Sequence, residues 1–148
     1  MLTENELIKF RRELHSYPET GWCEFVTTHK IVEKLRSFGL DPIYGRQVIN
    51  PEFVAGRNPA KVEEAKKAAL DKGVPPEFIE SMQDYTGVAA IFETGRPGPV
   101  LAIRFDMDCV DVDEAHEAGH RPFDEGWAST NPGHMHSCGH DGHTCLLY

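Results

Sequence analysis

The sequence predicts an α/β domain, in which a mixed sheet is flanked by helices. Apolar residues recur at helical spacing through the first forty residues. Two short apolar runs follow later in the chain, on either side of a segment rich in glycine and proline. A polar segment rich in Asp, Cys and His comes after the second run. Strands preceded and followed by helices are typical of α/β architecture.

Size and composition are those of one globular domain. The chain has 148 residues, of which 40% are hydrophobic and 26% charged. A net charge of −9 without a basic block argues against nucleic-acid binding. No apolar run reaches the roughly 20 residues of a membrane span, and the first residues do not have the pattern of a secretory leader. We therefore expect a cytoplasmic protein with reduced thiols and no membrane partner.

Two helices are predicted near the N-terminus. The first covers residues 4–15, where Thr3 and Glu6 have the spacing of a capping box. The second covers about 24–38, with apolar residues along one face. Gly39 follows it as a natural helix terminator.

The next part of the chain is more charged. Residues 42–49 are expected to be extended, and residues 50–85 to form a charged helical insertion. Within it the pattern predicts a helix over 61–72 and a shorter one over 76–85. We expect solvated helices inserted between core elements. A role in shaping substrate access or a partner surface stays open.

Two strands are expected after this segment. The apolar runs 87–93 and 100–105 flank the Gly/Pro-rich turn 94–99, which predicts a hairpin of neighbouring strands. The second run is almost entirely apolar, as is typical of a central strand.

Carboxylates follow the second predicted strand. Asp106 and Asp108 are two residues apart, so in an extended chain both side chains share one face. Like charges that close favour a nearby cation, although one of the two could instead cap a loop. Asp111, Asp113 and Glu114 follow, and they could be simple solvated acids.

The segment 136–143, HSCGHDGH, carries the strongest chemical signal. In an extended loop Cys138 and His140 would share a face, with only a glycine between them to crowd an ion. Thiolate and imidazole suit zinc and other transition divalent ions. If a helix begins near Asp141, His143 would be a close neighbour of His140.

Other interpretations of this segment remain open. Cys138 could be a thiol nucleophile activated by a histidine. A structural zinc site would want four protein ligands, and no second ligand pair supplies them convincingly. A satisfied core position is the remaining alternative, and it fits such a polar cluster poorly.

Three motifs resemble one known family. Residues 12–19 (RELHSYPE), 104–108 (RFDMD) and 136–144 (HSCGHDGHT) look like successive motifs of the M20 metallopeptidases, and the Cys-Gly-His-Asp form is that of the amidohydrolase branch. The resemblance covers nearly the whole chain. It implies a Zn-peptidase-like catalytic domain, of which residues 1–148 would be the N-terminal part, without the family's dimerisation domain.

The resemblance also implies a chemistry. Two divalent ions, zinc or manganese, would serve hydrolysis of a small-molecule amide, an N-acyl or N-aryl amino acid such as p-aminobenzoyl-glutamate. Cys138 and His140 correspond to metal ligands, and Asp108 to an orienting group behind the metal. Asp106, Asp141 and His143 are possible supporting residues.

Some of the family's machinery has no counterpart here. A downstream Glu-Glu pair, which includes the general base, and two further histidine ligands would come after the HSCGHDGHT motif, where only four residues of this chain remain. We therefore expect the first third of an enzyme, inactive by itself, which self-associates or binds a chain that completes its sheet. The alternative is a non-catalytic remnant that binds a metal or a partner.

Overall fold

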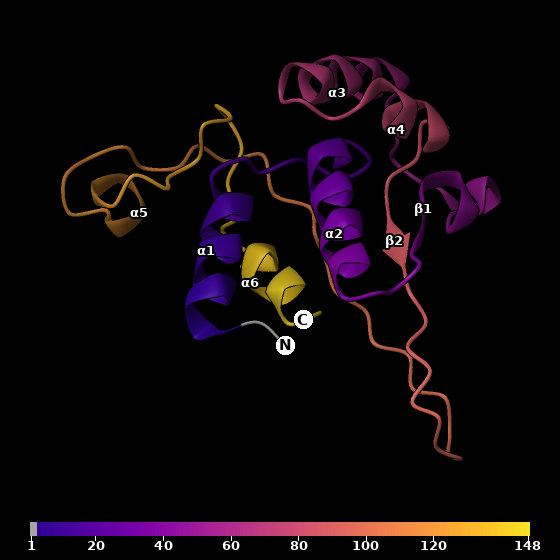
Figure 1. Ribbon diagram of the computed structural model, residues 1–148. Helices are drawn as coiled ribbons and strands as arrows, with labels where there is room; N and C mark the ends of the chain where they lie inside the picture. The colour runs from indigo at the N-terminus through magenta and orange to yellow at the C-terminus, as the bar shows by residue number, and fades with distance from the viewer. Residues whose placement is uncertain (1–2) are drawn as a thin grey trace. The chain divides into compact units, whose positions relative to one another are not determined.

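The computed structural model describes residues 3–148, and the chain divides into two compact units (Figure 1). The first unit combines the N-terminal segment, up to Gly21, with Ile103–Tyr148. The second unit is Trp22–Ala102. The first holds α1 (Glu4–His15), α5 (Arg121–Asp124) and α6 (His140–Cys145). The second holds α2 (Phe25–Ser37), α3 (Pro59–Asp71), α4 (Pro76–Ser81) and a two-stranded sheet.

The core of the first unit lies between α1 and α6, which pack side by side (Figure 1). Phe10 and Leu14 of α1 are buried against Cys145 of α6. The ring of Tyr148 meets Phe10 edge-on, with 5.3 Å between ring centroids. The predicted capping box of α1 is confirmed, because the Thr3 and Glu6 side chains each bond the other's backbone N–H.

Irregular chain fills the rest of the first unit. Isolated bridges join Thr20 to Cys109 in parallel and Val110 to Met135 antiparallel. These bridges bring the segment after Asp108 against the N-terminal segment and against the loop that precedes α6. The part of the chain that carries the Asp, Cys and His motifs is thus held by backbone hydrogen bonds without a full sheet.

The helices of the second unit largely confirm the prediction. α2 spans Phe25–Ser37, and Gly39 follows with a left-handed φ of 79°. α3 is capped by the side chain of Asn58 and begins with a proline. α3 also has a buried side, formed by Val62 and Ala69, and it packs on α2. The segment 50–85 is therefore anchored in the core of its unit rather than wholly solvated.

The sheet is smaller than predicted. β1 (Ile43–Tyr44) pairs antiparallel with β2 (Val88–Ala89). The expected extended run 42–49 turns after two residues into the 3₁₀ helix η1 (Gly45–Gln47), and a second one, η2, covers Pro51–Phe53. Gly45 has φ 62°, and a Cβ there would lie 2.6 Å from the Cα of Met82, so this tight contact needs glycine.

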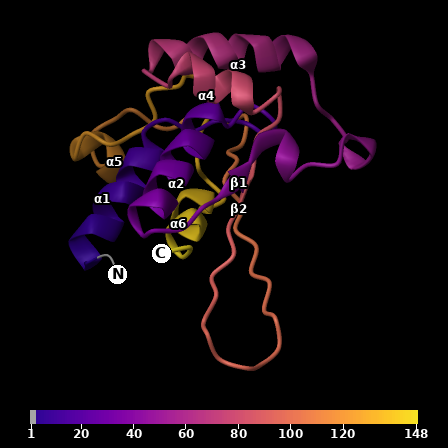
Figure 2. The same ribbon diagram turned by 45° about the vertical axis from the view of Figure 1, so that its right-hand side comes forward.

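Two sequence predictions in this region are wrong. The helix expected to reach Tyr85 ends at Ser81. The hairpin of 87–93 with 100–105 does not form, since β2 pairs with β1 and residues 90–105 have no strand. Figure 2 shows a long loop following β2. The apolar side chains of this loop are exposed, with Val100 98% and Leu101 81% exposed. No packed layer therefore covers the two runs and stabilises them as paired strands.

The described residues contain no membrane-spanning helix and no disulfide. Within residues 3–148, none of the helices combines the length and the apolar character that crossing a bilayer requires. All four cysteines are free thiols, with Cys138 exposed and the other three buried.

Candidate functional site

The ring of His140 is oriented by Asp108. His140 begins α6, and its Nδ1 lies 2.9 Å from the backbone carbonyl oxygen and 3.0 Å from Oδ1 of Asp108. Both oxygens are acceptors when the carboxyl is ionised, so Nδ1 carries the proton and donates to both. In the neutral ring the lone pair then resides on Nε2. This is the tautomer that a metal-ligating histidine adopts when a carboxylate holds its other nitrogen.

His143 has the opposite arrangement. Its Nδ1 accepts a hydrogen bond of 3.1 Å from the backbone N–H of Asp106. The lone pair is therefore used on Nδ1, and the proton of the neutral ring sits on Nε2. Oδ2 of Asp106 lies 3.4 Å from the same nitrogen, a contact that is an ion pair only when the ring is protonated. The predicted proximity to His140 is present, with 6.3 Å between the ring centroids.

Asp106 and Asp108 each contact a different one of these two histidines. Asp108 bonds His140, whereas Asp106 contacts His143 and forms an ion pair with the exposed Arg104. Thr144 adds a hydrogen bond of 2.9 Å to the Asp106 carbonyl oxygen. Side-chain contacts at three positions of α6 therefore tie this helix to the segment 104–108.

Cys138 is an exposed thiol that precedes a sharp turn. The expected extended path through Cys138 and His140 is wrong, because Gly139 adopts φ 79° and ψ 18° and turns the chain into α6. A Cβ on Gly139 would meet nothing within 4 Å. Glycine at position 139 is therefore explained by the left-handed backbone conformation, and not by crowding against the described atoms.

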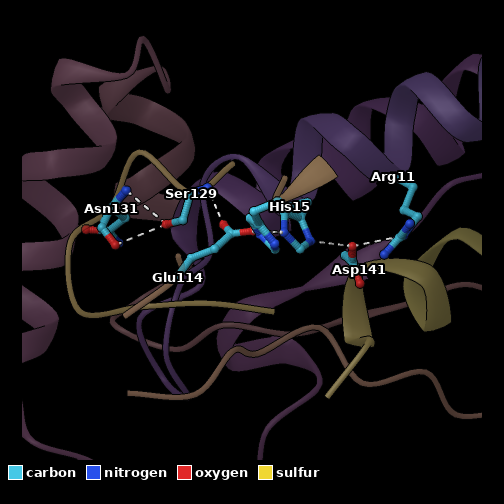
Figure 3. A network of polar contacts seen from close by, with 7 residues as sticks. Arg11, His15, Glu114, Ser129, Asn131 and Asp141 are labelled. Atoms are coloured by element: carbon cyan, nitrogen blue, oxygen red, sulfur yellow. Dashed lines mark hydrogen bonds and ion pairs between the residues drawn. The ribbon is translucent and has the colours of Figure 1, made fainter. Parts of the chain in front are cut away.

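Asp141 contacts α1. It is 1% exposed, and its Oδ2 accepts from His15 Nδ1 at 2.9 Å and from Arg11 Nε at 3.0 Å (Figure 3). The other carboxylate oxygen, Oδ1, is buried without a hydrogen-bond partner. The residue predicted as a possible supporting group therefore joins α6 to α1.

Glu114 completes this network, and its prediction as a solvated acid is wrong. It is 9% exposed, and its Oε1 accepts from His15 Nε2 at 3.0 Å (Figure 3). The same oxygen accepts from His120 Nε2 at 2.8 Å. Its second oxygen accepts from the backbone N–H of Ser129. Buried carboxylates are stable only with such partners, which is why three segments converge on this side chain.

The protonation of this network follows from its contacts. Burial alone would lower the pKa of His15, but the hydrogen bonds to Asp141 and Glu114 outweigh burial and raise that pKa above 6.5. Burial would likewise raise the pKa of Glu114, but the hydrogen bonds from His120, His15 and Ser129 lower it. Burial acts in the same direction on the pKa of Asp141, and the hydrogen bonds from His15 and the Gly142 backbone lower that pKa instead. All three shifts favour the charged forms, so the network stabilises an imidazolium between two carboxylates.

His136 is a separate buried histidine. It is 4% exposed, both ring nitrogens lack hydrogen-bond partners, and burial lowers its pKa to about 4. Its ring centroid lies 6.3 Å from that of His15. It is therefore a neutral imidazole next to the charged network.

Sequence reasoning missed His15 and Glu114 as functional candidates. His15 lies within the RELHSYPE motif, four residues after Arg11 on the same helical face, and this spacing is the signal that could have found it. Nothing local distinguishes Glu114 from the neighbouring acids, because its burial depends on partners 99 and 15 residues away.

The donor set fits a divalent metal in part. An exposed thiol and an imidazole with its lone pair on Nε2 are ligands of zinc and similar ions. Within residues 3–148, however, no group of three or more His, Cys, Asp or Glu side chains gathers in a metal-binding arrangement. Described residues thus supply two candidate ligands and a carboxylate that orients one of them.

Comparisons with known proteins agree with these motifs. No protein-family model matches the chain. It is 46% identical over 143 residues to a homolog of a p-aminobenzoyl-glutamate hydrolase subunit from Haemophilus influenzae, covering 96% of this chain and 34% of that protein. It is 42% identical to an indole-3-acetyl-aspartic acid hydrolase of Enterobacter agglomerans, covering 95% and 33%. The chain thus spans about a third of the length of the curated relatives it matches.

Solved structures give the same family. An aminobenzoyl-glutamate utilization protein from Klebsiella pneumoniae superposes with a TM-score of 0.66 at 34% identity, over 72% of this chain and 28% of that one. A dinuclear metal binding peptidase of the M20 family from Bacillus subtilis superposes with a TM-score of 0.59 at 28% identity, over 95% and 27%. The sequence motifs, the α/β fold and these matches together support assignment of the chain to the M20 amidohydrolase family, and it aligns with about a third of the length of its relatives.

Proposed function

We propose that residues 1–148 form one side of the metal site of an amidohydrolase, with Cys138 and His140 as ligands. The observation that carries the proposal is the Asp108–His140 contact, because the carboxylate fixes the tautomer that leaves Nε2 able to bind a metal. A bound divalent ion would supply Lewis acidity and lower the pKa of water. Asp108 acts as the positioning residue behind His140.

The proposed substrate class follows from the relatives. Two curated relatives are named for hydrolysis of p-aminobenzoyl-glutamate and of indole-3-acetyl-aspartic acid, which are amides of acidic amino acids. We propose an N-acyl or N-aryl amino acid such as p-aminobenzoyl-glutamate as the substrate of the complete enzyme. Zinc or manganese is the proposed ion, with two ions at the complete site, in line with the dinuclear metal binding neighbour. A cytoplasmic location is part of the same proposal.

Further polypeptide would complete both the site and the sheet. Two protein ligands bind a metal weakly, and within residues 3–148 no third His, Cys, Asp or Glu side chain joins them in a metal-binding arrangement. The exposed apolar loop after β2, including Ile91, Phe92 and Leu101, supports a completing partner chain or self-association. We retain the proposal that 50–85 is an insertion in the family's catalytic domain.

Titration of the purified chain with Zn²⁺ and Mn²⁺ by calorimetry tests the ligand assignment. Cys138→Ser and His140→Gln should each weaken binding at least tenfold, as expected when one of few ligands is lost. The matched control is His134→Gln, a nearby histidine whose Nδ1 contacts the Pro132 carbonyl. Equal affinity in the wild type and both ligand variants would reject the assignment.

An activity assay tests whether the chain needs further polypeptide for turnover and whether the reaction uses a metal or a thiol. With p-aminobenzoyl-glutamate and added Zn²⁺ or Mn²⁺, the chain alone should release no p-aminobenzoate. Robust turnover that a chelator abolishes would contradict the need for further polypeptide. Turnover that survives the chelator but is lost in Cys138→Ser would favour a thiol enzyme over a metal enzyme.

A further inference from the structure

The buried network joins three segments that are remote in sequence. His15 lies at the end of α1, Asp141 in the first turn of α6, and Glu114 in the irregular chain before α5. Figure 3 shows the His15 ring between the two carboxylates, with Arg11 on the far side of Asp141. The His15 and Glu114 side chains are at most 5% exposed.

Each ring nitrogen of His15 faces a carboxylate oxygen, which can only accept when the carboxyl is ionised. Nδ1 lies 2.9 Å from Asp141 and Nε2 lies 3.0 Å from Glu114. Both nitrogens must therefore donate, which requires the imidazolium form. The Trp127 ring packs edge-on against the His15 ring, with 5.0 Å between ring centroids, and limits the freedom of the imidazole to rotate.

The candidate metal ligand adjoins this network. His140 directly precedes Asp141 and belongs to α6, which has only six residues. A helix that short has no stable orientation of its own. Side-chain contacts hold the N-terminal turn of α6. At Asp141 these are a buried contact with His15 and an ion pair with Arg11, whose side chain is 45% exposed.

We propose that His15, supported by Arg11, is a positioning residue for the candidate metal-binding loop. By holding Asp141 it fixes the first turn of α6 and hence the direction in which His140 presents its ring. The predicted effect on metal affinity rests on the proposed function. The predicted effect on the order of α6 does not depend on any metal.

Two substitutions of His15 separate positioning from general stability. The amide nitrogen of Asn extends about as far as Nδ1, so His15→Asn can keep the hydrogen bond to Asp141. The amide of Gln extends about as far as Nε2, so His15→Gln can keep the bond to Glu114. Both variants lose the charge and one hydrogen bond. A purely structural role predicts that metal affinity falls in step with stability in the two variants.

The readouts are Zn²⁺ affinity by calorimetry and backbone hydrogen exchange of the metal-free chain. We expect His15→Gln to weaken Zn²⁺ binding roughly tenfold, the low end of the effect of groups that orient a ligand. His15→Asn should stay within about threefold of the wild type by the same measure. Exchange of the α6 amides should be faster in His15→Gln than in His15→Asn, with α3 of the other unit as an internal control.

Equal affinity and equal α6 exchange in the two variants would overturn the inference. If the wild-type chain binds no Zn²⁺, the proposed function fails, and the exchange of α6 alone decides the role of His15. If either variant fails to fold, Arg11→Gln serves instead, because its side chain is 45% exposed and its loss leaves the core intact. Arg11→Gln should speed α6 exchange and weaken Zn²⁺ binding, and an unchanged α6 would overturn the inference.

Discussion

Replacing Glu114 by glutamine removes one charge from the buried network while keeping the shape of the side chain. The carboxylate accepts from His15, His120 and the Ser129 backbone. A glutamine keeps one oxygen acceptor, but its NH₂ group must face at least one of these donors. Hydrogen bonds to charged groups contribute about 1.5–3 kcal/mol each.

Losing one or two of these bonds beside a buried imidazolium should lower the free energy of unfolding by about 3 kcal/mol, at the low end for breaking a buried ion pair. Urea denaturation followed by far-ultraviolet circular dichroism measures this value, with an unchanged m-value as the check that only stability changed. Glu117→Gln, an exposed acid in the same segment, should stay within about 0.5 kcal/mol of the wild type. A Glu114→Gln loss no larger than that control would refute the network as a stabilising element.

Three further predictions concern protonation, thiol access and backbone conformation. Because the folded pKa of His15 is raised, its stabilising contribution is fully present below about pH 6.5 and is lost as the pH rises through the folded pKa. The stability difference between wild type and His15→Gln, measured in chelator from pH 5 to 9, should therefore shrink towards high pH, and a growing difference would contradict the assignment. In the native chain a thiol reagent should modify Cys138 alone at first, and the three buried cysteines only on unfolding, as mass spectrometry would show. Gly139→Ala should cost about 1 kcal/mol in the same urea assay, from its left-handed φ without any clash, and no cost would argue against that conformation.

Helices are predictable from this sequence because their signals are local. The capping box of Thr3 and Glu6 marks the start of α1, and Asn58 followed by proline marks that of α3. Apolar periodicity indicates how far α1 and α2 extend. The helix considered as one possibility near Asp141 is α6, which begins at His140.

Strands and burial depend on remote partners. The runs 87–93 and 100–105 are apolar enough for strands, yet β2 pairs with β1, and Val100 is almost fully exposed. Strand formation needs a neighbour and a covering face, which local sequence cannot specify. Glu114 is buried by His15, 99 residues earlier, for the same reason.

The candidate site is predictable at the level of residue type. The resemblance assigns Asp108 and His140 to one metal site, and their contact is present in the structure. The path between Cys138 and His140 is not predictable in this way, because a glycine fits an extended loop as well as the left-handed turn that Gly139 adopts. The distinction between His140 and His143 depends on which ring nitrogen each one uses, which follows from the fold alone.

Cobalt titration of the metal-free chain tests the central assignment most directly. A thiolate–cobalt bond gives a charge-transfer absorption in the near ultraviolet, so the spectrum reports whether sulfur is a ligand. We predict that this band appears in the wild type and in Cys23→Ala, is absent in Cys138→Ser, and is weakened in His140→Gln. A band that persists in Cys138→Ser, or that never appears in the wild type, would contradict the account.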